Sequence, residues 1–212
     1  MTGSTGYVGR ALVMALLARG HRVDALARPS SLASVPAGAR PVAGDALDAA
    51  SFAAAIAPSA TLVHLVGTPH PNPSKAAEFE RIDLASIRAS VDAAGRAQAA
   101  HLVYVSVAQP APVMHAYVAA RAAGEAAIRA ADLTATILRP WYVVGPGHRW
   151  PVLLAPLYHL AEWLPSTRAT ARRLGLVTLT QMVAALVAAV EQPPARGIAR
   201  IVEVPQIRAA AP

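Results

Sequence analysis

Apolar positions along the chain alternate between two patterns. Short, nearly continuous apolar runs, such as residues 61–66, are typical of strands buried on both faces of a parallel sheet. Longer stretches, in which apolar residues recur three and four positions apart, predict helices between those runs. We expect strands at residues 21–27, 40–43, 61–66, 101–106, 134–138 and 197–204, and helices at residues 7–19, 47–56, 75–100 with a bend near Gly95, 115–131 and 179–190.

This alternation of strands and helices predicts an α/β fold. Successive strand–helix–strand units connect parallel strands through right-handed crossovers, so helices cover both faces of the sheet. We therefore expect a doubly wound parallel sheet in residues 1–144. A small C-terminal region, residues 145–212, should pack on the same domain. The length of 212 residues and a hydrophobic content of 55% suffice for one large core.

The first residues have the features of a dinucleotide-binding turn. Glycines recur with the spacing G-x-x-G-x-x-G directly before a predicted helix. In such a turn the first glycine permits a tight bend, the second lets the backbone approach a pyrophosphate, and the third lets the helix pack on its strand. The helix N-terminus offers free N–H groups to the phosphates. The turn predicts a Rossmann-type cofactor site made by Gly3, Ser4, Thr5, Gly6, Tyr7, Val8 and Gly9.

The strand that should precede this turn is largely missing from the chain. A Rossmann turn follows the central strand of the sheet, but only Met1 and Thr2 stand before Gly3. Met1 stands where a valine could end that strand, and our hypothesis is that either the true start lies upstream or the chain is a fragment. Without this strand its two neighbours would have unpaired edges, and we expect such a chain either to be poorly stable or to fill the gap with another segment or a neighbouring molecule.

Composition and charge narrow the function classes. The chain has no cysteine, which excludes disulfides, thiolate metal sites and a cysteine nucleophile. Its net charge is +7, but Lys75 is the only lysine and the arginines are scattered, so nucleic-acid binding is disfavoured. His64, His101 and His115 show no metal-ligand spacing, and we expect no metal site. No signal peptide is visible, so we expect a cytoplasmic protein.

Further motifs follow the glycine turn in a fixed order. They are Gly44-Asp45, Tyr104-Val105-Ser106, Tyr117-x-x-x-Arg121 and a run from Leu138 to Gly147. The ordered set resembles an extended or atypical short-chain dehydrogenase/reductase, above all the NmrA-like NAD(P)-binding group, which also resembles accessory subunits of respiratory complex I. The resemblance covers nearly the whole chain. It implies a sheet ordered 3-2-1-4-5-6, a cofactor across the carboxyl ends of the strands, and a C-terminal region that covers the substrate.

Arg28 bears on the choice of cofactor. It ends the second strand, where an Asp or Glu would bind the ribose hydroxyls of NAD, whereas an arginine can pair with the 2′-phosphate of NADP. NADP is therefore favoured over NAD, with a solvated strand-end arginine as the alternative. Asp45 matches the family's adenine-contacting turn, or it caps a turn. The resemblance extends the cofactor-binding residues to Ala46, Val66, Gly67, Pro140, Tyr142 and Val143.

Ser106, Tyr117 and Arg121 are the candidate catalytic residues. The resemblance implies that Tyr117 exchanges a proton with the substrate oxygen, which Ser106 orients. Arg121 stands where the family has a lysine that supports the tyrosine and holds the nicotinamide ribose. An arginine retains the positive charge but is bulkier and differs in geometry. The alternative is an ordinary helix face, on which Glu125 forms a surface ion pair with Arg121. His64, on a buried strand, is interpreted as a core histidine.

An apolar segment follows the last motif. Trp150 to Leu164 is too short and too often interrupted by proline to span a bilayer. It could form an apolar substrate pocket, a membrane-surface helix followed by Arg168, Arg172 and Arg173, or a core-facing helix of the covering region. We therefore keep peripheral membrane contact open, and the sequence does not fix the oligomeric state.

Three functions remain. The first is an NADP-dependent oxidoreductase, or an epimerase-like enzyme, acting on a small or apolar carbonyl or hydroxyl compound. The second is a non-catalytic NAD(P)-sensing regulator or assembly factor, which the Arg121 substitution favours. The third is a peripheral membrane quinone-related protein, which rests on the segment from Trp150 to Leu164. Turnover on a panel of carbonyl and alcohol compounds would separate the first from the second.

Overall fold

A parallel sheet runs through the centre of the protein. The computed structural model describes residues 1–146 and 173–210. Four strands form one continuous part of the sheet, in the order β3-β4-β5-β8, and two more form a second part, β1-β2. Every pairing within these parts is parallel. The strands are β1 (Asp24–Ala27), β2 (Arg40–Ala43), β3 (Thr61–His64), β4 (His101–Val105), β5 (Ala135–Arg139) and β8 (Ala199–Glu203).

Met1 and Thr2 join the two parts of the sheet. The Thr2 N–H donates to the Val63 carbonyl at 2.9 Å, and Thr2 forms a parallel bridge with His64. On the other side the Leu26 N–H donates to the Met1 carbonyl at 2.8 Å. The order from one edge to the other is therefore β2, β1, Met1–Thr2, β3, β4, β5, β8, which confirms the expected 3-2-1-4-5-6 order and adds β8 at the edge.

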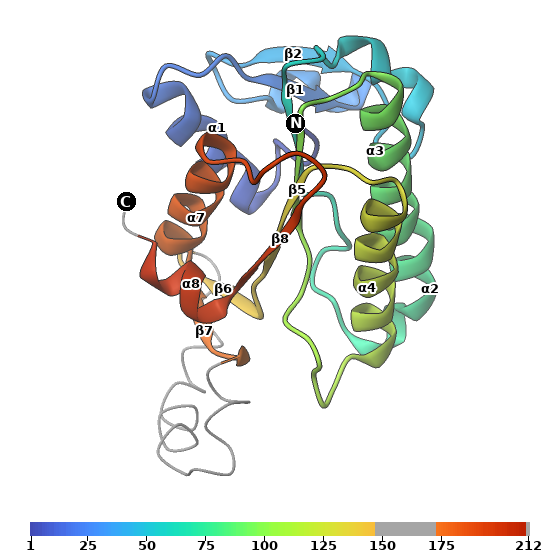
Figure 1. Ribbon diagram of the computed structural model, residues 1–212, viewed down its shortest axis with the longest axis vertical. Coiled ribbons are helices and arrows are strands. Elements are labelled where there is room, and N and C mark those ends of the chain that lie inside the picture. The colour runs from blue at the N-terminus through green and yellow to red at the C-terminus, as the bar shows by residue number, and fades with distance from the viewer. Residues whose placement is uncertain (147–172, 211–212) are drawn as a thin grey trace.

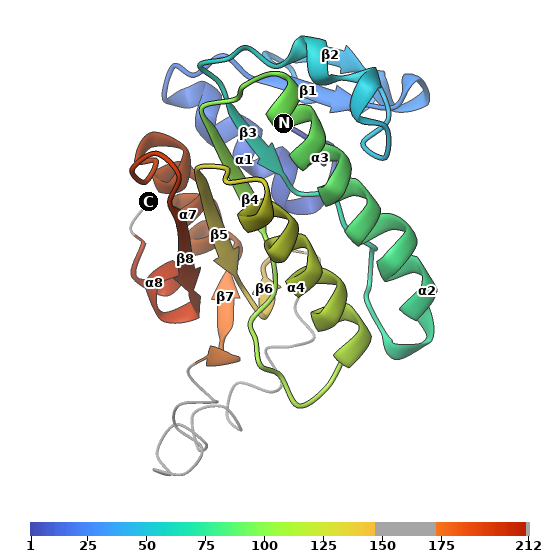
Figure 2. The same ribbon diagram turned by 45° about the vertical axis from the view of Figure 1, so that its right-hand side comes forward.

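Helices cover both faces of the sheet, as Figures 1 and 2 show. One face carries α1, α7 and α8, and the other carries α3 and α4. The predicted doubly wound α/β fold is thus confirmed. The helices are α1 (Tyr7–Ala18), α3 (Ala85–Arg96), α4 (His115–Ala130), α7 (Leu179–Glu191) and α8 (Val204–Ala209).

Each face of the sheet has its own apolar core. On the first face, leucines and valines of α1 pack with Met182 and Leu186 of α7 against Val103 of β4. On the second, Leu102 and Tyr104, which alternate with Val103, pack against Ile87 and Ile128 of α3 and α4. Alternation along a strand therefore fills both cores, as expected for strands that are buried on both sides.

The helix predicted at residues 47–56 is wrong. The segment forms two short 3-10 helices, η2 (Ala49–Ser51) and η3 (Ala53–Ala55). The Ser51 hydroxyl bonds the backbone at Asp45 and Asp48, and Phe52, at φ −139°, turns its ring into the core, where it is 3% exposed. Tertiary burial of Phe52 thus overrides the helix propensity of the surrounding alanines.

The long helix predicted at residues 75–100 is interrupted at another place than Gly95. A 3-10 turn, η4 (Pro73–Lys75), and a short helix, α2 (Ala76–Glu78), lead into a π-helical turn, η5 (Phe79–Leu84), before α3 begins. The wide turn allows Phe79, Asp83 and Leu84 all to be buried. Such π-turns are rare in proteins as a whole, but those that occur are often found at functional sites. Asp83 is therefore a candidate functional residue.

Residues after 144 continue the same core. β6 (Tyr142–Val144) pairs with β7 (Leu176–Thr178), and α7 begins at a capping box formed by Thr178 and Gln181. The apolar segment from Trp150 to Leu164 lies outside the described residues, and so do Arg168 and Arg172. No helix in residues 1–146 and 173–210 is both long and apolar enough to cross a membrane.

Candidate cofactor site

A cavity of about 400 Å³ opens beside the glycine turn, between the carboxyl ends of β1 and β3. At this point the chain order across the sheet reverses, since β1 and β3 lie on opposite sides of Met1 and Thr2. Ligands of doubly wound sheets bind at such a switch point. The predicted site residues that line the cavity are Gly3, Thr5, Gly6, Arg28, Asp45, Ala46, Val66 and Gly67.

The glycines have the geometry that a close-fitting phosphate requires. Gly3 adopts φ +72°, and a Cβ there would lie 2.8 Å from the carbonyl carbon of Leu65. A Cβ on Gly9 would collide with the backbone of Gly3, so only glycine lets α1 pack on the turn. By contrast, a Cβ on Gly6 would meet only the Gly3 oxygen, at 3.3 Å, and the rest of its surroundings is open. The cradle therefore fits a pyrophosphate against Gly6.

The remaining residues of the turn hold it in place and do not line the cavity. Ser4 is buried, and its hydroxyl donates to the Leu26 carbonyl at 3.4 Å. Val8 packs against the core of the first face. The Tyr7 hydroxyl lies against Gly145, where a Cβ would overlap it. These side chains anchor the turn to β1, to α7 and to the end of β6.

Arg28 projects from the end of β1 at the rim of the cavity. It is exposed and precedes a 3-10 helix, η1 (Pro29–Ser34), whose Ser31 also lines the cavity. Within residues 1–146 and 173–210 its side chain has no hydrogen bond or ion pair, unlike Arg40 on the neighbouring strand, which pairs with Asp24 at 2.7 Å. Arg28 is therefore a cation without a protein partner beside a cavity of cofactor size.

Asp45 lies across the cavity from the glycine turn. Its Oδ1 accepts a hydrogen bond from the Leu47 N–H at 2.9 Å, which closes the turn that carries Ala46. Both residues line the cavity. The turn interpretation of Asp45 and the adenine-contact interpretation are compatible, because the second carboxylate oxygen has no protein donor in the described structure.

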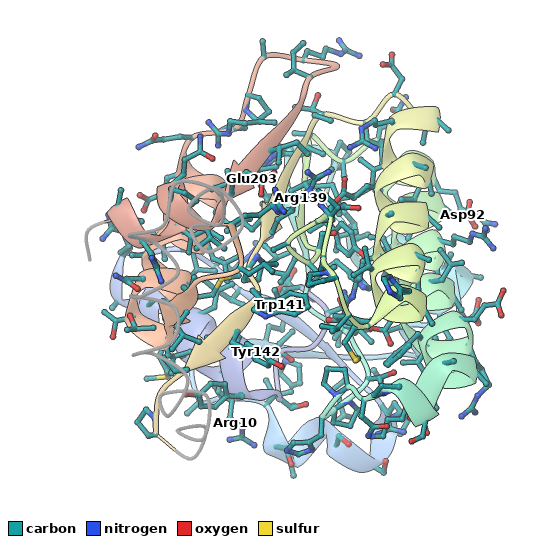
Figure 3. The ribbon with its side chains drawn as sticks, turned by 90° about the horizontal axis from the view of Figure 1, so that it is seen from below. Arg10, Asp92, Arg139, Trp141, Tyr142 and Glu203 are labelled. Atoms are coloured by element: carbon teal, nitrogen blue, oxygen red, sulfur yellow. The ribbon has the colours of Figure 1, made fainter. Side chains whose placement is uncertain are left out.

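The predicted cofactor residues Pro140, Tyr142 and Val143 lie apart from this cavity, at the end of β5. Figure 3, a view from below, places Trp141 and Tyr142 near the middle of this side of the molecule, beside Arg139. Their rings pack edge to face, with the ring centres 5.5 Å apart. Pro140 is buried, and its carbonyl accepts from the Ala108 N–H at 2.9 Å. Aromatic rings at this position give the region beyond the cavity an apolar surface.

Tyr117 and Arg121 are brought together on α4. The Arg121 guanidinium lies 5.2 Å from the centre of the Tyr117 ring and 5.9 Å from that of Tyr104. It forms an ion pair with Asp83 at 2.7 Å, in which Asp83 is fully buried and the Arg121 side chain is 7% exposed. Burial raises the pKa of Tyr104 to about 12, so this phenol stays neutral.

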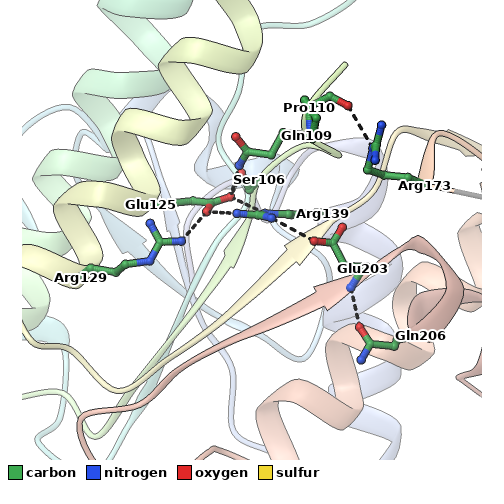
Figure 4. A network of polar contacts seen from close by, with 9 residues as sticks. All are labelled: Ser106, Gln109, Pro110, Glu125, Arg129, Arg139, Arg173, Glu203 and Gln206. Atoms are coloured by element: carbon green, nitrogen blue, oxygen red, sulfur yellow. Dashed lines mark hydrogen bonds and ion pairs between the residues drawn. The ribbon is translucent and has the colours of Figure 1, made fainter. Parts of the chain in front are cut away.

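Ser106 lies in a different network, drawn in Figure 4. Its hydroxyl donates to Glu125 at 2.7 Å, and Gln109 donates to the same oxygen at 2.7 Å. Arg139 binds both oxygens of this carboxylate, at 2.9 and 2.6 Å. Arg129 donates to Oε2 at 2.8 Å. No hydrogen bond in the described part of the chain links Ser106 to Tyr117 or Arg121. β4 and α4 nevertheless bring all three residues to one edge of the sheet.

The surface ion pair expected between Glu125 and Arg121 is wrong. Glu125 is 1% exposed and binds Arg129 and Arg139, while Arg121 pairs with Asp83. Arg121 and Glu125 do not meet although they are four apart on one helix, since the two side chains turn toward different strands. Burial opposes ionisation of Glu125, but the hydrogen bonds from Arg139 and Ser106 outweigh burial and lower its pKa.

His64 is a core histidine, as the sequence indicates. It is fully buried, with Nδ1 2.8 Å from the Ser90 hydroxyl and 3.1 Å from that of Thr2. Burial, with a smaller contribution from Arg121, lowers its pKa to about 3, so the ring is neutral. The residue that sequence reasoning missed is Asp83. The sequence held a signal for it in Arg121, a charged residue of the alanine-rich α4. A charge that is buried on such a helix needs a partner of opposite charge.

Comparisons with known proteins agree with this geometry. A family model described as NAD(P)H-binding matches residues 3–148. A ceramide reductase of Caulobacter vibrioides is 31% identical over 195 residues, which cover 89% of this chain and 59% of the reductase. The chain thus spans less than two thirds of that relative.

Solved structures share the fold at lower identity. A short-chain dehydrogenase/reductase superfamily protein of Agrobacterium tumefaciens with bound NAD has a TM-score of 0.66 and 21% identity, over 98% of this chain and 81% of its own. A UDP-glucuronic acid 4-epimerase of Bacillus cereus in complex with NAD has a TM-score of 0.67 and 16% identity, over 95% and 76%. The chain belongs to the NAD(P)H-binding family and has the fold of atypical short-chain dehydrogenases/reductases.

Proposed function

We propose that the protein is an oxidoreductase that uses NADP(H) to interconvert a carbonyl and a hydroxyl group on an apolar compound. The observation that carries the choice of cofactor is Arg28, a cation at the rim of the cavity that has no partner among the residues that the structure describes. A guanidinium at this position can bind the 2′-phosphate of NADP through charge-assisted hydrogen bonds. Ser31, on the following turn, is placed to add a hydroxyl donor.

The end of β1 also lacks what NAD recognition requires. The ribose hydroxyls of NAD are usually bound by an acidic side chain at the end of this strand. Here the acidic residue of β1 is Asp24 at its start, and both of its oxygens are held by Arg40 at 2.7 Å. Asp24 therefore offers no free carboxylate to a ribose beside Arg28.

The proposed reaction uses Tyr117 as the proton donor. When bound, a reduced nicotinamide supplies a hydride to the carbonyl carbon. Tyr117 would give its hydroxyl proton to the carbonyl oxygen, and in the reverse direction it would take a proton from the alcohol. Ser106 would contribute through the lone pairs that its bond to Glu125 leaves available for a substrate hydroxyl.

The side chains near Tyr117, at the carboxyl edge of the sheet, favour an apolar substrate. Trp141 and Tyr142 lie there, and Val113 is 52% exposed in the loop before α4. The similarity to a ceramide reductase points in the same direction, because that relative is named for a lipid substrate. We therefore expect long-chain or aromatic ketones to be better substrates than small hydrophilic ones.

Cofactor titrations test the proposal. NADPH should bind wild type more tightly than NADH by about 1.5–3 kcal/mol, the range for a hydrogen bond to a charged group. Arg28→Ala should remove this preference by weakening NADPH alone. Arg22→Ala, an exposed arginine two residues before the same strand, is the matched control and should change neither affinity. Equal affinities of wild type for the two cofactors would refute the NADP assignment.

A second candidate is an NAD(P)-sensing regulator without turnover. It is favoured by one observation: Arg121 and Ser106 are both engaged by buried carboxylates, Asp83 and Glu125. A broad panel of ketones and alcohols with NADPH and NADP distinguishes the candidates. Binding without any turnover on the panel would favour the regulator, whereas turnover lost in Tyr117→Phe would favour the enzyme.

A further inference from the structure

An arginine–aspartate pair lies directly behind the wall of the cofactor cavity. Arg121 comes from α4 and Asp83 from the π-helical turn η5, and their charged groups meet at 2.7 Å. Ile82, the neighbour of Asp83, lines the cavity, and so do Val66 and Gly67. Asp83 is thus one residue away from the cavity along η5, and the Arg121 side chain lies against Val66 and Gly67 of the wall.

Both members of the pair hold the backbone of that wall. Asp83 Oδ2 accepts from the Thr68 N–H at 3.0 Å and from the Thr68 hydroxyl at 2.5 Å. Arg121 Nη1 donates to the Val105 carbonyl at 2.9 Å and, over 3.4 Å, to that of Val66. The segment from Val66 to Thr68 is therefore bound at one end by a guanidinium and at the other by a carboxylate.

The backbone of Gly67 lies between the Val66 and Thr68 contacts, directly against the ion pair. A Cβ on Gly67 would overlap the terminal nitrogen of Arg121 and approach Asp83 Oδ1 to 3.2 Å. The backbone of the cavity wall thus rests directly on the ion pair, with no side chain between them. A shift of the guanidinium would be transmitted to the surface that the cofactor contacts.

The geometry points to Arg121, together with Asp83, as a positioning residue for the cofactor: the pair fixes the Val66–Thr68 wall of the cavity. In this role Arg121 stabilises the bound cofactor through backbone that it holds, and it does not transfer a proton. The inference rests on cofactor binding in this cavity and is independent of the proposed reaction.

The shape of the guanidinium explains why an arginine occupies this position. Its planar fork reaches a carboxylate with one nitrogen and the carbonyls of Val66 and Val105 with the other, in fixed directions. The rings of Tyr104 and Tyr117 lie near it and restrict its orientation. A lysine carries a single ammonium on a flexible stem and does not reproduce these simultaneous contacts.

NADPH titration of folded variants, with thermal unfolding measured in parallel, tests the inference. Arg121→Lys should weaken NADPH binding about tenfold, as expected when a hydrogen bond from a charged group is lost. Arg129→Lys is the matched control, since Arg129 lies on the same helix and pairs with Glu125 away from the wall. It should leave the NADPH affinity unchanged.

Two variants keep the test valid if Arg121→Lys does not fold. Thr68→Val removes one hydrogen bond to Asp83 and should weaken NADPH several-fold. Gly67→Ala presses on the guanidinium and should weaken it about tenfold or more. A purely structural pair would lower the melting temperature but leave the affinity of the folded protein unchanged.

The results separate this inference from the proposed function. If wild type binds NADPH and the folded Arg121→Lys, Thr68→Val and Gly67→Ala proteins bind it within twofold of wild type, the positioning role is refuted while NADP use stands. If Arg121→Lys keeps its affinity but loses turnover, Arg121 acts in catalysis and the inference is also refuted. Preferential binding of NADH by wild type, weakened in the three variants, would support the inference and refute the NADP proposal.

Discussion

Charged side chains lie in opposite environments on the two sides of the carboxyl edge of the sheet. On the β1 side, formed by the glycine turn, Arg28 and Asp45, a cation stands exposed beside an open cavity. On the β4 side, formed by Ser106, Tyr117 and Arg121, the charges are buried and engaged by Asp83 and Glu125. In our account the β1 side recognises a charged ligand, whereas the β4 side forms a rigid wall.

This difference has a physical basis. An exposed arginine keeps its hydration until a phosphate replaces it, so it costs the folded state little. A buried charge must be paired within the protein, and breaking such a pair costs about 3–5 kcal/mol. The β4 side therefore contributes to stability and rigidity before any ligand arrives, whereas the β1 side contributes to selection among ligands.

The largest effect should follow from breaking the Glu125 network. Glu125→Ala leaves Arg139 with Glu203 only and removes the acceptor of Ser106, Gln109 and Arg129. We expect a loss of about 3–5 kcal/mol in the free energy of unfolding, measured by urea denaturation. Glu191→Ala, which breaks an exposed pair with Arg19, should cost at most about 1 kcal/mol. Similar losses in both variants would contradict the distinction between the two kinds of charge.

Removal of the Tyr117 hydroxyl should have the next largest effect. If the β4 side carries the reaction, Tyr117→Phe should lower the turnover rate about 100-fold or more and leave NADPH affinity nearly unchanged. Tyr104→Phe is the control, because it removes a hydroxyl on the other ring beside Arg121. Its rate should stay within a few-fold of wild type. An unchanged rate in Tyr117→Phe would remove this residue from the chemistry.

A smaller effect concerns the pH dependence of stability and the buried histidines of β3 and β4. The folded protein keeps His64 neutral down to about pH 3 and His101 down to about pH 4, both mainly because of burial. In the unfolded chain a histidine takes up its proton near the ordinary value of 6.5. Between about pH 6 and 4.5 the unfolded state therefore binds more protons, and stability falls as the pH falls.

Each histidine should contribute up to about 1.4 kcal/mol per pH unit to this slope. The measurement is the free energy of unfolding at several pH values in this window. His64→Gln should remove about half of the slope, and His64→Gln with His101→Gln should flatten it. A slope that persists in the double variant would show that other groups control the acid stability of the protein.

The fold was predictable because its signals are local. The apolar run before Gly67 and the spacing of Gly3, Gly6 and Gly9 mark a strand and a phosphate turn without reference to distant residues. Arg28 could be singled out for the same reason, since its position at the end of a strand follows from the sequence alone. Parallel strands then bring their ends to one edge, whatever the details of packing.

The contacts of the β4 side were not predictable in the same way. Arg121 pairs with Asp83, which is far away in the sequence and turned inward by a π-helical turn that no local pattern marks. Glu125 pairs with Arg139 on β5 as well as with Arg129 on its own helix, and not with Arg121. The helix at 47–56 failed because Phe52 is drawn into the core. In each case a long-range contact outweighs a local preference.

A crystal structure of this chain with NADPH bound would test the division between the two sides most directly. Our account predicts that the 2′-phosphate lies within hydrogen-bond distance of the Arg28 guanidinium, on the exposed β1 side. It also predicts that Arg121 stays paired with Asp83, with the cofactor against the backbone of Val66 and Gly67. A 2′-phosphate directed away from Arg28, or an Arg121 side chain released from Asp83 onto the nicotinamide ribose, would contradict it.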